Sequence, residues 1–514
     1  MLLLKEIVLN IVEFLKDDRA TLHSCILVNR EWCKIVIPIL WNDTFRRLKP
    51  FNNNGQSIEG KQIISTYTKL LSEESRNLLK KYGIKLVNNR KKPLFNYSEF
   101  LRHLDAYYLK VYVRSWFYFT TRDDMDIARK NYKTEQVQVM SFVLLNHFLE
   151  QTPCLISLKV ASTDITEAII KALIDNPQAG RCLSNLKSFK QHYNVHPVST
   201  NLFSQLSGHA WNIQNIDVAI QTEISELSTL IFNQKNLKRL TIRNKNVVFG
   251  SRMCKNYALS NKIKEIAPAI SHQSTSMTHL KLESIKFPLG SLNQFKNLIE
   301  LELKLCGYNQ EDLNTFTQIS LDNLEIFIFE SKYPIYLKSF VDLIRNSGKN
   351  LRKLTLHGCQ IEDPENAQKL IISLTKFSPN LVYYDGPILK DNTFELETML
   401  DQCTQLHTLL LHPSISRCYS PIPSIDFDPL FNIIAHNKSH KLKNLSIIHA
   451  WKISEDALLD FFETHKKKNI GPIQFNYEKD CTVFPGISTI CSKYNDFGVG
   501  LDCKITYYPK YYYH

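Results

Sequence analysis

Hydrophobic residues recur at steps of three and four near the start of the chain, which is the spacing of one face of an α-helix. Asp17 and Asp18 interrupt this pattern and can cap a second helix. A third hydrophobic set runs to Pro38, which lacks a backbone N–H and should end or kink the helix before Leu40 and Trp41. The pattern therefore predicts three short helices. Their hydrophobic positions are Ile7, Val8, Ile11, Val12, Phe14 and Leu15, then Leu22, Cys25, Ile26 and Val28, then Trp32, Ile35 and Val36.

A different pattern, L-x-x-L-x-L, returns from residue 152 onward. The alternation within L-x-L predicts a short strand whose hydrophobic side chains point into a core while the flanking residues point to the opposite face. The mean spacing is about 29 residues, at the upper end of the range of leucine-rich repeats. The copies are Leu155-Leu158-Val160, Leu186-Phe189, Ile213-Ile216-Val218, Leu237-Leu240-Ile242, Met277-Leu280-Leu282, Leu298-Leu301-Leu303, Leu324-Phe327-Phe329, Leu351-Leu354-Leu356, Leu381-Tyr384, Leu406-Leu409-Leu411, Leu442-Leu445-Ile447 and Ile470-Ile473-Phe475.

The twelve copies predict a solenoid over residues 152–514, with helices between the strands. Gln191, Lys332 and Gly386 stand at motif positions and predict local distortion of the repeats. Residues 47–151 show no repeat and read as a helical connector that caps the solenoid. Helices are expected there over 58–82, with a second start near Ser72, over 97–116 and over 134–151. The fold class is therefore α/β.

Composition narrows the chemistry of this chain of 514 residues. Its twelve cysteines form no Cys-x-x-Cys pair and stand beside no histidine cluster, so neither a zinc site nor a disulfide framework is expected. The cysteines are therefore expected to be reduced thiols, which indicates a location in the cytoplasm or the nucleus. No hydrophobic run is long enough to cross a membrane. Catalytic motifs and phosphate-binding glycine loops are lacking, so we expect no enzyme, no cofactor and no bound metal.

The formal net charge of +13 could indicate a polyanionic partner such as nucleic acid. The basic residues occur in small clusters, such as 89–93 and 466–468, and are elsewhere mixed with Asp and Glu. This distribution is better explained by solvated loops, so nucleic-acid binding is the weaker interpretation.

The amino-terminal residues resemble the F-box. The series Leu3-Leu4-x-Glu6-Ile7, a spaced Leu, Cys25-x-x-Val28, Trp32 and Leu40-Trp41 follows the order of that family, except that Leu4 replaces its usual proline. The resemblance implies that residues 1–46 bind the Skp adaptor and, through it, a cullin. The adaptor-binding residues that it implies are Leu3, Leu4, Glu6, Ile7, Ile11, Leu15, Leu22, Cys25, Val28, Trp32, Leu40 and Trp41.

The segments 298–306 and 351–359 extend the repeat to L-x-x-L-x-L-x-x-C, which resembles the ribonuclease-inhibitor-like class of leucine-rich repeats. In that class the cysteine ties the turn after the strand, so Cys306 and Cys359 are expected to be structural. Together the two resemblances imply the F-box and leucine-rich-repeat family of substrate receptors of ubiquitin ligases. A scaffold that keeps the F-box but works outside the ligase is the alternative, and the loss of the proline at Leu4 favours it slightly.

The strand residues that point away from the core are the candidate recognition surface for a protein substrate. A surface of mixed charge suits a protein with its own charge pattern better than a uniformly anionic polymer. The residues selected as substrate-binding are Arg239, Arg243, Lys281, Glu300, Glu302, Lys353, His357, Tyr383, Asp385 and His412.

Overall fold

The computed structural model describes residues 5–46, 57–86, 93–120, 134–160, 163–191, 200–220, 224–244, 257–360, 364–413, 425–437, 442–447, 451–468, 474–477, 482–483 and 504–505. The chain divides into two compact units, Met1–Leu237 and Lys238–His514. This boundary falls inside the predicted repeat array, between its third and fourth strands, and the domain bounds at residues 46 and 151 stay predictions.

The first unit begins with three helices, α1 (Lys5–Phe14), α2 (Arg19–Cys25) and α3 (Arg30–Trp41), called the head below. Asp18 caps α2 by accepting a hydrogen bond from the Thr21 backbone N–H at 3.1 Å, and Asn29 caps α3 through the Trp32 N–H at 3.0 Å. Both caps satisfy backbone donors that a helix start leaves without partners. The three predicted helices are therefore confirmed.

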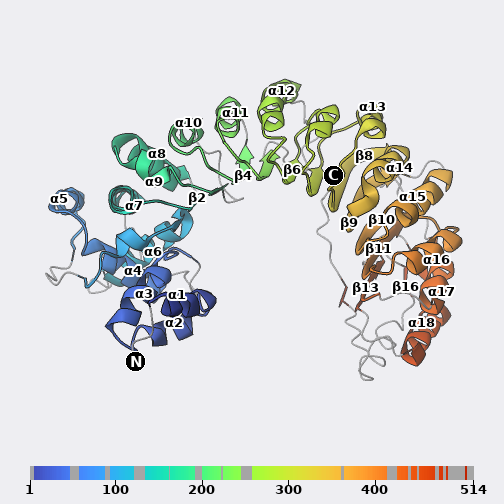
Figure 1. The fold of residues 1–514 in the computed structure, drawn as a ribbon, viewed down its shortest axis with the longest axis horizontal. Helices are drawn as coiled ribbons and strands as arrows, with labels where there is room; N and C mark the ends of the chain where they lie inside the picture. The colour runs from blue at the N-terminus through green and yellow to red at the C-terminus, as the bar shows by residue number, and fades with distance from the viewer. Residues whose placement is uncertain are drawn as a thin grey trace. The chain divides into compact units, whose positions relative to one another are not determined.

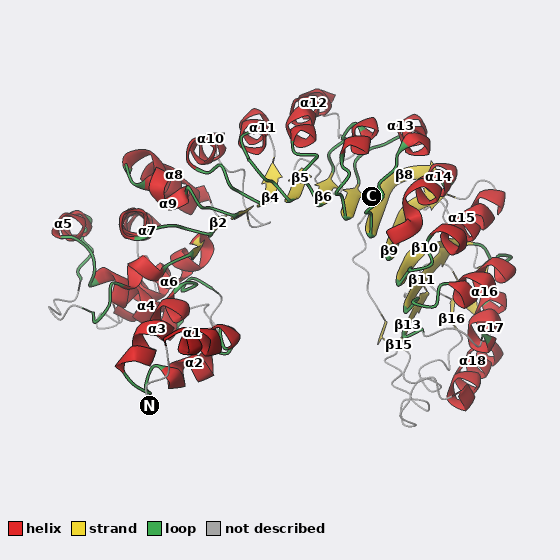
Figure 2. Ribbon diagram, viewed as in Figure 1, coloured by secondary structure: helices red, strands yellow, loops and turns green. Residues whose placement is uncertain are grey.

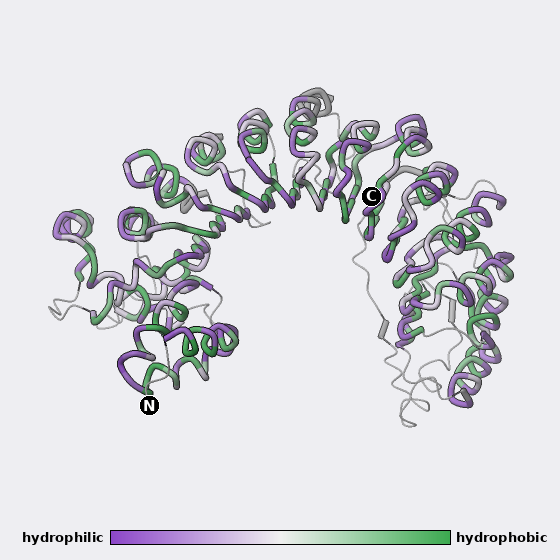
Figure 3. The backbone as a smooth tube through the Cα atoms, viewed as in Figure 1, coloured by the Kyte–Doolittle hydropathy of each residue, from purple (hydrophilic) through white to green (hydrophobic). Residues whose placement is uncertain are grey.

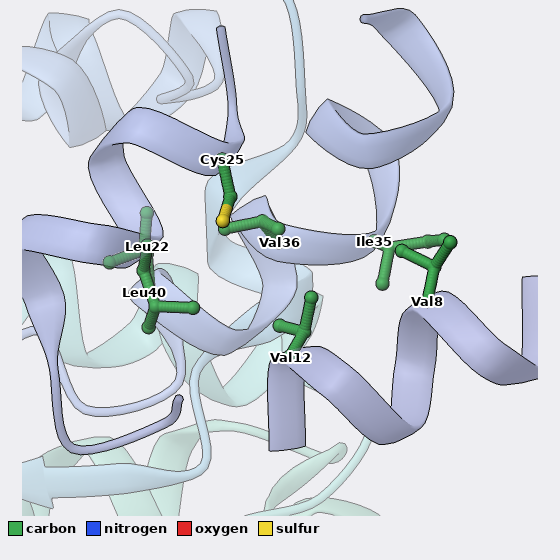
Figure 4. Packing of buried hydrophobic residues seen from close by; sticks show 7 residues of the cluster. All are labelled: Val8, Val12, Leu22, Cys25, Ile35, Val36 and Leu40. Atoms are coloured by element: carbon green, nitrogen blue, oxygen red, sulfur yellow. The ribbon is translucent and has the colours of Figure 1, made fainter. Parts of the chain in front are cut away.

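One hydrophobic cluster holds the head together. Its members come from all three helices and meet between them (Figure 4). Half-buried Leu15, Ile26, Trp32, Ile39 and Trp41 pack around the cluster. The buried members are Val8, Val12, Leu22, Cys25, Ile35, Val36 and Leu40.

Pro38 was expected to end or kink the third helix, and it does not end it, because α3 continues through this residue to Trp41. A proline inside a helix removes one backbone hydrogen bond. Here Ile35, Val36, Ile37 and Leu40 on both sides of Pro38 are buried, and their packing keeps the last turn helical. The tertiary contacts of the head therefore outweigh the local preference.

The connector follows with helices α4 (Ile58–Thr68), α5 (Glu73–Lys81), α6 (Ala106–Thr120) and α7 (Thr134–Gln151). Ser72 caps α5 by accepting a hydrogen bond from the Ser75 N–H at 3.2 Å, so the second helix start is confirmed. The helix over 134–151 is also confirmed.

The single helix predicted over 97–116 was wrong. The structure has a 3-10 turn, η1 (Tyr97–Phe100), then a short strand, β1 (His103–Asp105), and only then α6. The backbone N–H groups of Arg102 and His103 donate to the Asn42 carbonyl at 2.8 and 2.9 Å, and β1 pairs in parallel with the first predicted repeat strand. The connector therefore supplies the first strand of the sheet, and its contact with the head explains why both lie in one unit.

The repeats of the first unit alternate strands and helices. Strands β1 to β4 form a parallel sheet in chain order. The elements are β2 (Ser157–Val160), α8 (Thr163–Asp175), α9 (Ala179–Leu183), β3 (Ser188–Gln191), α10 (Thr200–His209), β4 (Asn215–Ile220) and α11 (Ile224–Phe232).

The second unit continues the same alternation, with helices or 3-10 turns after the strands. Figures 1 and 2 show its main strands side by side with the helices on one face of the sheet. The elements are β5 (Arg239–Asn244), α12 (Tyr257–His272), β6 (His279–Glu283), η2 (Leu289–Gln294), β7 (Glu300–Lys304), α13 (Gln310–Asn314), η3 (Thr315–Gln318), β8 (Ile326–Tyr336), α14 (Lys338–Ser347), η4 (Gly348–Asn350), β9 (Lys353–Gln360), α15 (Pro364–Phe377), β10 (Tyr383–Ile388), α16 (Thr393–Gln402), β11 (Thr408–Pro413), β12 (Ile425–Asp426), α17 (Asp428–His436), β13 (Asn444–Ile447), β14 (Trp451–Ile453), α18 (Glu455–Lys468), β15 (Gln474–Tyr477), β16 (Thr482–Val483) and β17 (Lys504–Ile505).

The leucine positions of the motif stand in register across the sheet of the second unit. Leu280 pairs with Leu301, Leu301 with Phe327, and Phe327 with Leu354, and each of these side chains is at most 1% exposed. Hydrophobic and hydrophilic positions alternate along the strands (Figure 3). Each of the twelve motif copies has at least one residue in a strand, so the predicted parallel repeat array is confirmed. Ile470 and Ile473 of the last copy lie outside the described residues.

The distortions predicted at irregular motif positions are also confirmed. The β8–β9 register shifts between Glu330 and Ile335, across Lys332. The β9–β10 ladder ends at Asp385, immediately before Gly386. In the first unit the β3–β4 ladder ends at Lys190, and the Gln191 side chain instead accepts a hydrogen bond from the Ala219 N–H at 3.3 Å. A second small parallel sheet, β12-β14-β16, was not predicted.

One buried histidine makes the stability of the first unit depend on pH. His147 on α7 is 6% exposed, and its Nε2 lies 2.8 Å from the Ser98 hydroxyl. Burial lowers the pKa of His147 from 6.5 to about 4. His147 therefore becomes protonated near pH 6.5 in the unfolded chain but only near pH 4 in the folded chain. Its contribution to the free energy of unfolding is complete above pH 6.5 and is lost as the pH falls from 6.5 to about 4.

We expect the free energy of unfolding of the first unit to fall by roughly 2 kcal/mol more between pH 7 and pH 5 in the wild type than in His147→Gln. Glutamine can keep a hydrogen bond to Ser98 but does not titrate. Urea unfolding at both pH values checks this, with the exposed His23→Gln in the same unit as the matched control. Parallel pH profiles for wild type and His147→Gln would contradict the assignment.

Candidate functional site

The head displays a hydrophobic stripe on its surface. Ile7, Ile11 and Phe14 follow one side of α1 and are 43%, 37% and 91% exposed. Val8 and Val12, on the adjacent side of the same helix, are buried in the head cluster. The hydrophobic positions of α1 therefore divide into an inward pair and an outward stripe. Exposed hydrophobic side chains that gather in this way are typical of a protein interaction site.

Two more exposed hydrophobic residues lie where α2 connects to α3. Leu27 is 82% exposed and Val28 is 60% exposed. Sequence reasoning selected Val28 but did not select Leu27 or Phe14 as site residues. The position of Phe14, seven residues after Ile7, would have placed it on the same helical face as Ile7 and Ile11.

The other residues of the predicted adaptor site differ in how deeply they are buried in the head. Leu22, Cys25 and Leu40 are buried in the head cluster, where they stabilise the fold. Leu15 and Trp32 are half-buried at its edge, and Glu6 is exposed. Leu3 and Leu4 lie outside the described residues.

Trp41 faces the connector. Its ring lies 4.0 Å from that of Tyr97 and 5.6 Å from that of Tyr67, measured between centroids. The buried Phe45 ring stacks on Tyr67 at 5.8 Å, and the Thr44 hydroxyl lies 3.1 Å from the Tyr67 hydroxyl. These aromatic contacts fix the end of α3 against the connector within the first unit.

The ten predicted substrate-binding residues all lie on strands β5 to β11 of the second unit, at positions that alternate with the buried leucines. We call the side of the sheet that carries them the polar face. On its first strand Arg239 is exposed, whereas the other nine are half-buried or buried.

Charged residues of β5 to β7 pair with one another across the polar face. The Lys281 ammonium lies 2.7 Å from Glu300 and 3.3 Å from Glu302, and the Lys304 ammonium lies 2.7 Å from Glu302. Arg243 and Glu283 are 3.7 Å apart. Because the strands are in register, opposite charges on neighbouring strands stand side by side.

This pairing shifts two pKa values. Burial by itself would lower the pKa of Lys281, but the hydrogen bond to Glu300 and the charges of Glu302 and Glu300 outweigh it and raise that pKa. Burial would raise the pKa of Glu302, but the hydrogen bonds and charges of Lys304 and Lys281 lower that pKa. Both groups stay ionised near neutral pH and are held in a network that stabilises the face.

A second network crosses β9 to β11. The His357 Nε2 lies 2.8 Å from the Asp385 Oδ1, and the Tyr383 hydroxyl donates to the Asp385 Oδ2 at 3.4 Å. The Lys353 ammonium lies 4.5 Å from the centre of the Tyr383 ring, and the rings of His357 and His412 are 5.5 Å apart. The structure thus brings together five of the ten residues selected from sequence. Within the described residues, His357, Asp385 and His412 are the group that could hold a metal ion.

The cysteine of the extended motif is structural, as expected. The Cys306 thiol donates to the carbonyl oxygens of Leu282 and Lys304 at 3.4 and 3.3 Å. Burial raises the pKa of this thiol to about 12. Cys306 is therefore protonated and holds the turn after β7. The side chain of Cys359 lies outside the described residues.

Comparison with known proteins gives structural neighbours alone. No protein-family model matches the chain, and no curated protein matches it. Among solved structures, the chain is similar to one of the Rad7 and Elc1 complex in yeast, with 13% identity, a TM-score of 0.41, and coverage of 74% of this chain and 89% of that chain. It is also similar to an internalin from Listeria monocytogenes, with 13% identity, a TM-score of 0.32, and coverage of 62% of this chain and 74% of that chain.

The repeats described above define an α/β solenoid of the leucine-rich-repeat type. Among the helices that the structure describes, none is both long enough and hydrophobic enough to span a lipid bilayer.

We expect Glu302→Gln to lower the free energy of unfolding of the second unit by about 1–2 kcal/mol at pH 7, because two lysines then lose a charged partner. Since the folded pKa of Glu302 is lowered, its contribution is present above the ordinary pKa of 4.5 and is lost as the pH falls through the folded value. The difference from wild type should therefore shrink in acid.

Chemical denaturation at pH 7 and pH 4 measures this effect. Glu365→Gln is the matched control, since its ion pair with Lys369 is exposed and is expected to change stability by less than about 0.5 kcal/mol. Equal losses in the two variants would show that the network on the polar face adds nothing to stability.

Proposed function

We propose that this protein is a substrate receptor of a Skp-cullin-F-box ubiquitin ligase. The head would act as an F-box that binds the Skp adaptor, and the polar face would bind a protein substrate. The observation that supports this most directly is the exposed stripe of Ile7, Ile11 and Phe14 on a three-helix head whose residue series resembles the F-box.

The division of α1 into two hydrophobic sides supports the adaptor role. A helix that serves only as a cap would need its inward side, Val8 and Val12, and would gain nothing from an outward stripe. Covering the stripe with a partner would remove the three side chains from water, which contributes about 25 cal/mol per Å² of hydrophobic area.

The polar face supports the substrate role. Most charged residues of the polar face are already paired with one another within the sheet. They would therefore offer a substrate a surface of fixed shape and charge pattern, with few unpaired charges. Arg239 is exposed, and no ion pair of this residue occurs within the described part of the chain. Arginine is favoured at the centres of protein interfaces, which makes Arg239 a strong candidate for direct contact.

In the proposed role the protein catalyses no reaction itself. It would raise the effective concentration of substrate lysines near the ubiquitin-carrying enzyme, which is a contribution of proximity. Such a receptor would act in the cytoplasm or the nucleus, where its partners are found.

We expect the double substitution Ile7→Asp and Ile11→Asp to weaken binding of the Skp adaptor by about 100-fold or more, because two hydrophobic contacts are replaced by charges that lose their hydration. Co-purification of the full chain with Skp and cullin, followed by titration of purified Skp, measures the effect. The helical circular dichroism signal should not change, since both side chains are exposed.

Leu9→Asp is the matched control. Leu9 lies on the same helix, is 42% exposed and points to a different side from Ile7 and Ile11. It should bind the adaptor like the wild type. Absence of Skp from the wild-type complex would refute the proposed function, and Skp without cullin would favour a scaffold that works outside the ligase.

A further inference from the structure

We propose that His357, Asp385 and His412 form a binding site for a divalent transition-metal ion, zinc above all, on the polar face of the second unit. The site needs neither the F-box nor a substrate, so it does not rest on the proposed function. Three neighbouring repeats supply one ligand each, from β9, β10 and β11.

The sheet register explains why these side chains meet. His412 on β11 pairs with Pro387 on β10, and Asp385 lies two residues before Pro387 on the same face of the sheet. Asp385 pairs with Thr355 on β9, and His357 follows two residues later. The carboxylate therefore stands on the central strand, and the two imidazoles approach it from the strands on either side.

The distances suit a small metal ion. The candidate donor atoms all lie within 4.8 Å of one another, and His357 Nε2 and Asp385 Oδ1 are 2.8 Å apart. Zinc bonds of about 2.0–2.2 Å to nitrogen and oxygen need donors about 3.5 Å apart in a tetrahedron. Movements of about 1 Å, within reach of side-chain rotation, would bring the three donors to that geometry.

The charges around Asp385 suit a bound cation. Asp385 is 4% exposed, and its partners within the described residues are His357 and Tyr383, neither of which carries a permanent positive charge. Lys353 lies over the Tyr383 ring and forms no ion pair with Asp385 among the described residues. A buried carboxylate is stable when it is paired with a charge or coordinates a metal, and a metal ion between the three side chains would meet that need.

The donor types select the metal. Two imidazoles and one carboxylate favour zinc and similar transition metals over calcium and magnesium, which prefer oxygen ligands. The hydrogen bond from Tyr383 to the second carboxylate oxygen would orient Asp385, as groups around metal ligands commonly do. Three protein ligands leave one tetrahedral position for water or for a side chain of a bound protein.

The test uses the full-length chain, stripped of metal with a chelator and kept reduced. Titration with Co²⁺ should give one equivalent of a tetrahedral d–d spectrum without a sulfur-to-cobalt charge-transfer band, and Zn²⁺ should displace the cobalt. His357→Gln and His412→Gln should each weaken Zn²⁺ binding by about 100-fold or more, since loss of an outer-shell group alone costs about 10–100-fold.

His436→Gln is the matched control. The His436 Nε2 lies 3.6 Å from Asp460 on a neighbouring helix, and among the described residues this histidine–carboxylate pair belongs to no group of three possible ligands. It should bind zinc like the wild type, and circular dichroism should show that all three variants fold.

Three outcomes would overturn the proposal: no stoichiometric metal binding, equal binding in His412→Gln and wild type, or a thiolate band that assigns the metal to cysteine. The result is separate from the adaptor test, because neither histidine variant changes the head and both should still co-purify with Skp.

Discussion

Burial of the leucine positions on each strand holds this protein together. A single repeat exposes the core side of its strand, and only the neighbouring repeats cover it, so stability comes from stacking. The residues that stack are in register from β5 to β11, for example Leu280, Leu301 and Phe327, which are almost completely buried. A fixed register follows, because a slip of one residue would turn every leucine toward water.

The same register creates the polar face. Side chains that alternate with the leucines are forced into rows about 4.8 Å apart, so charges on neighbouring strands must be compatible. Glu300, Lys281 and Glu302 meet this constraint by pairing with one another. The rows also bring His357, Asp385 and His412 together, although each is about one repeat from the next in sequence. Solenoid geometry therefore allows a compact site to be built from distant residues.

The head is stabilised differently from the repeats. Its three helices form a small core, and small domains leave a large share of their hydrophobic surface in water. Two contacts compensate for this. Trp41 and Phe45 pack against the aromatic side chains of the connector, and the backbone of Asn42 accepts hydrogen bonds from the start of β1. The exposed stripe on α1 is formed by other residues, so the residues that join the head to the connector differ from those of the stripe.

The sequence by itself determined the twelve repeat strands, the three helices of the head and the helix over 134–151, because periods of 2 and 3.6 residues directly reflect which face is buried. It did not determine the strand at 103–105 or the continuation of α3 through Pro38. Both depend on contacts from residues that are distant in sequence, which outweigh the local preferences. The sequence also did not show which hydrophobic residues of α1 are buried. Ile7, Ile11 and Phe14 are exposed whereas Val8 and Val12 are buried, yet all five lie on one broad hydrophobic side of the helix. Which charges pair, and which side chains converge around Asp385, was decided only when the strands came into register, because these contacts join residues one repeat apart.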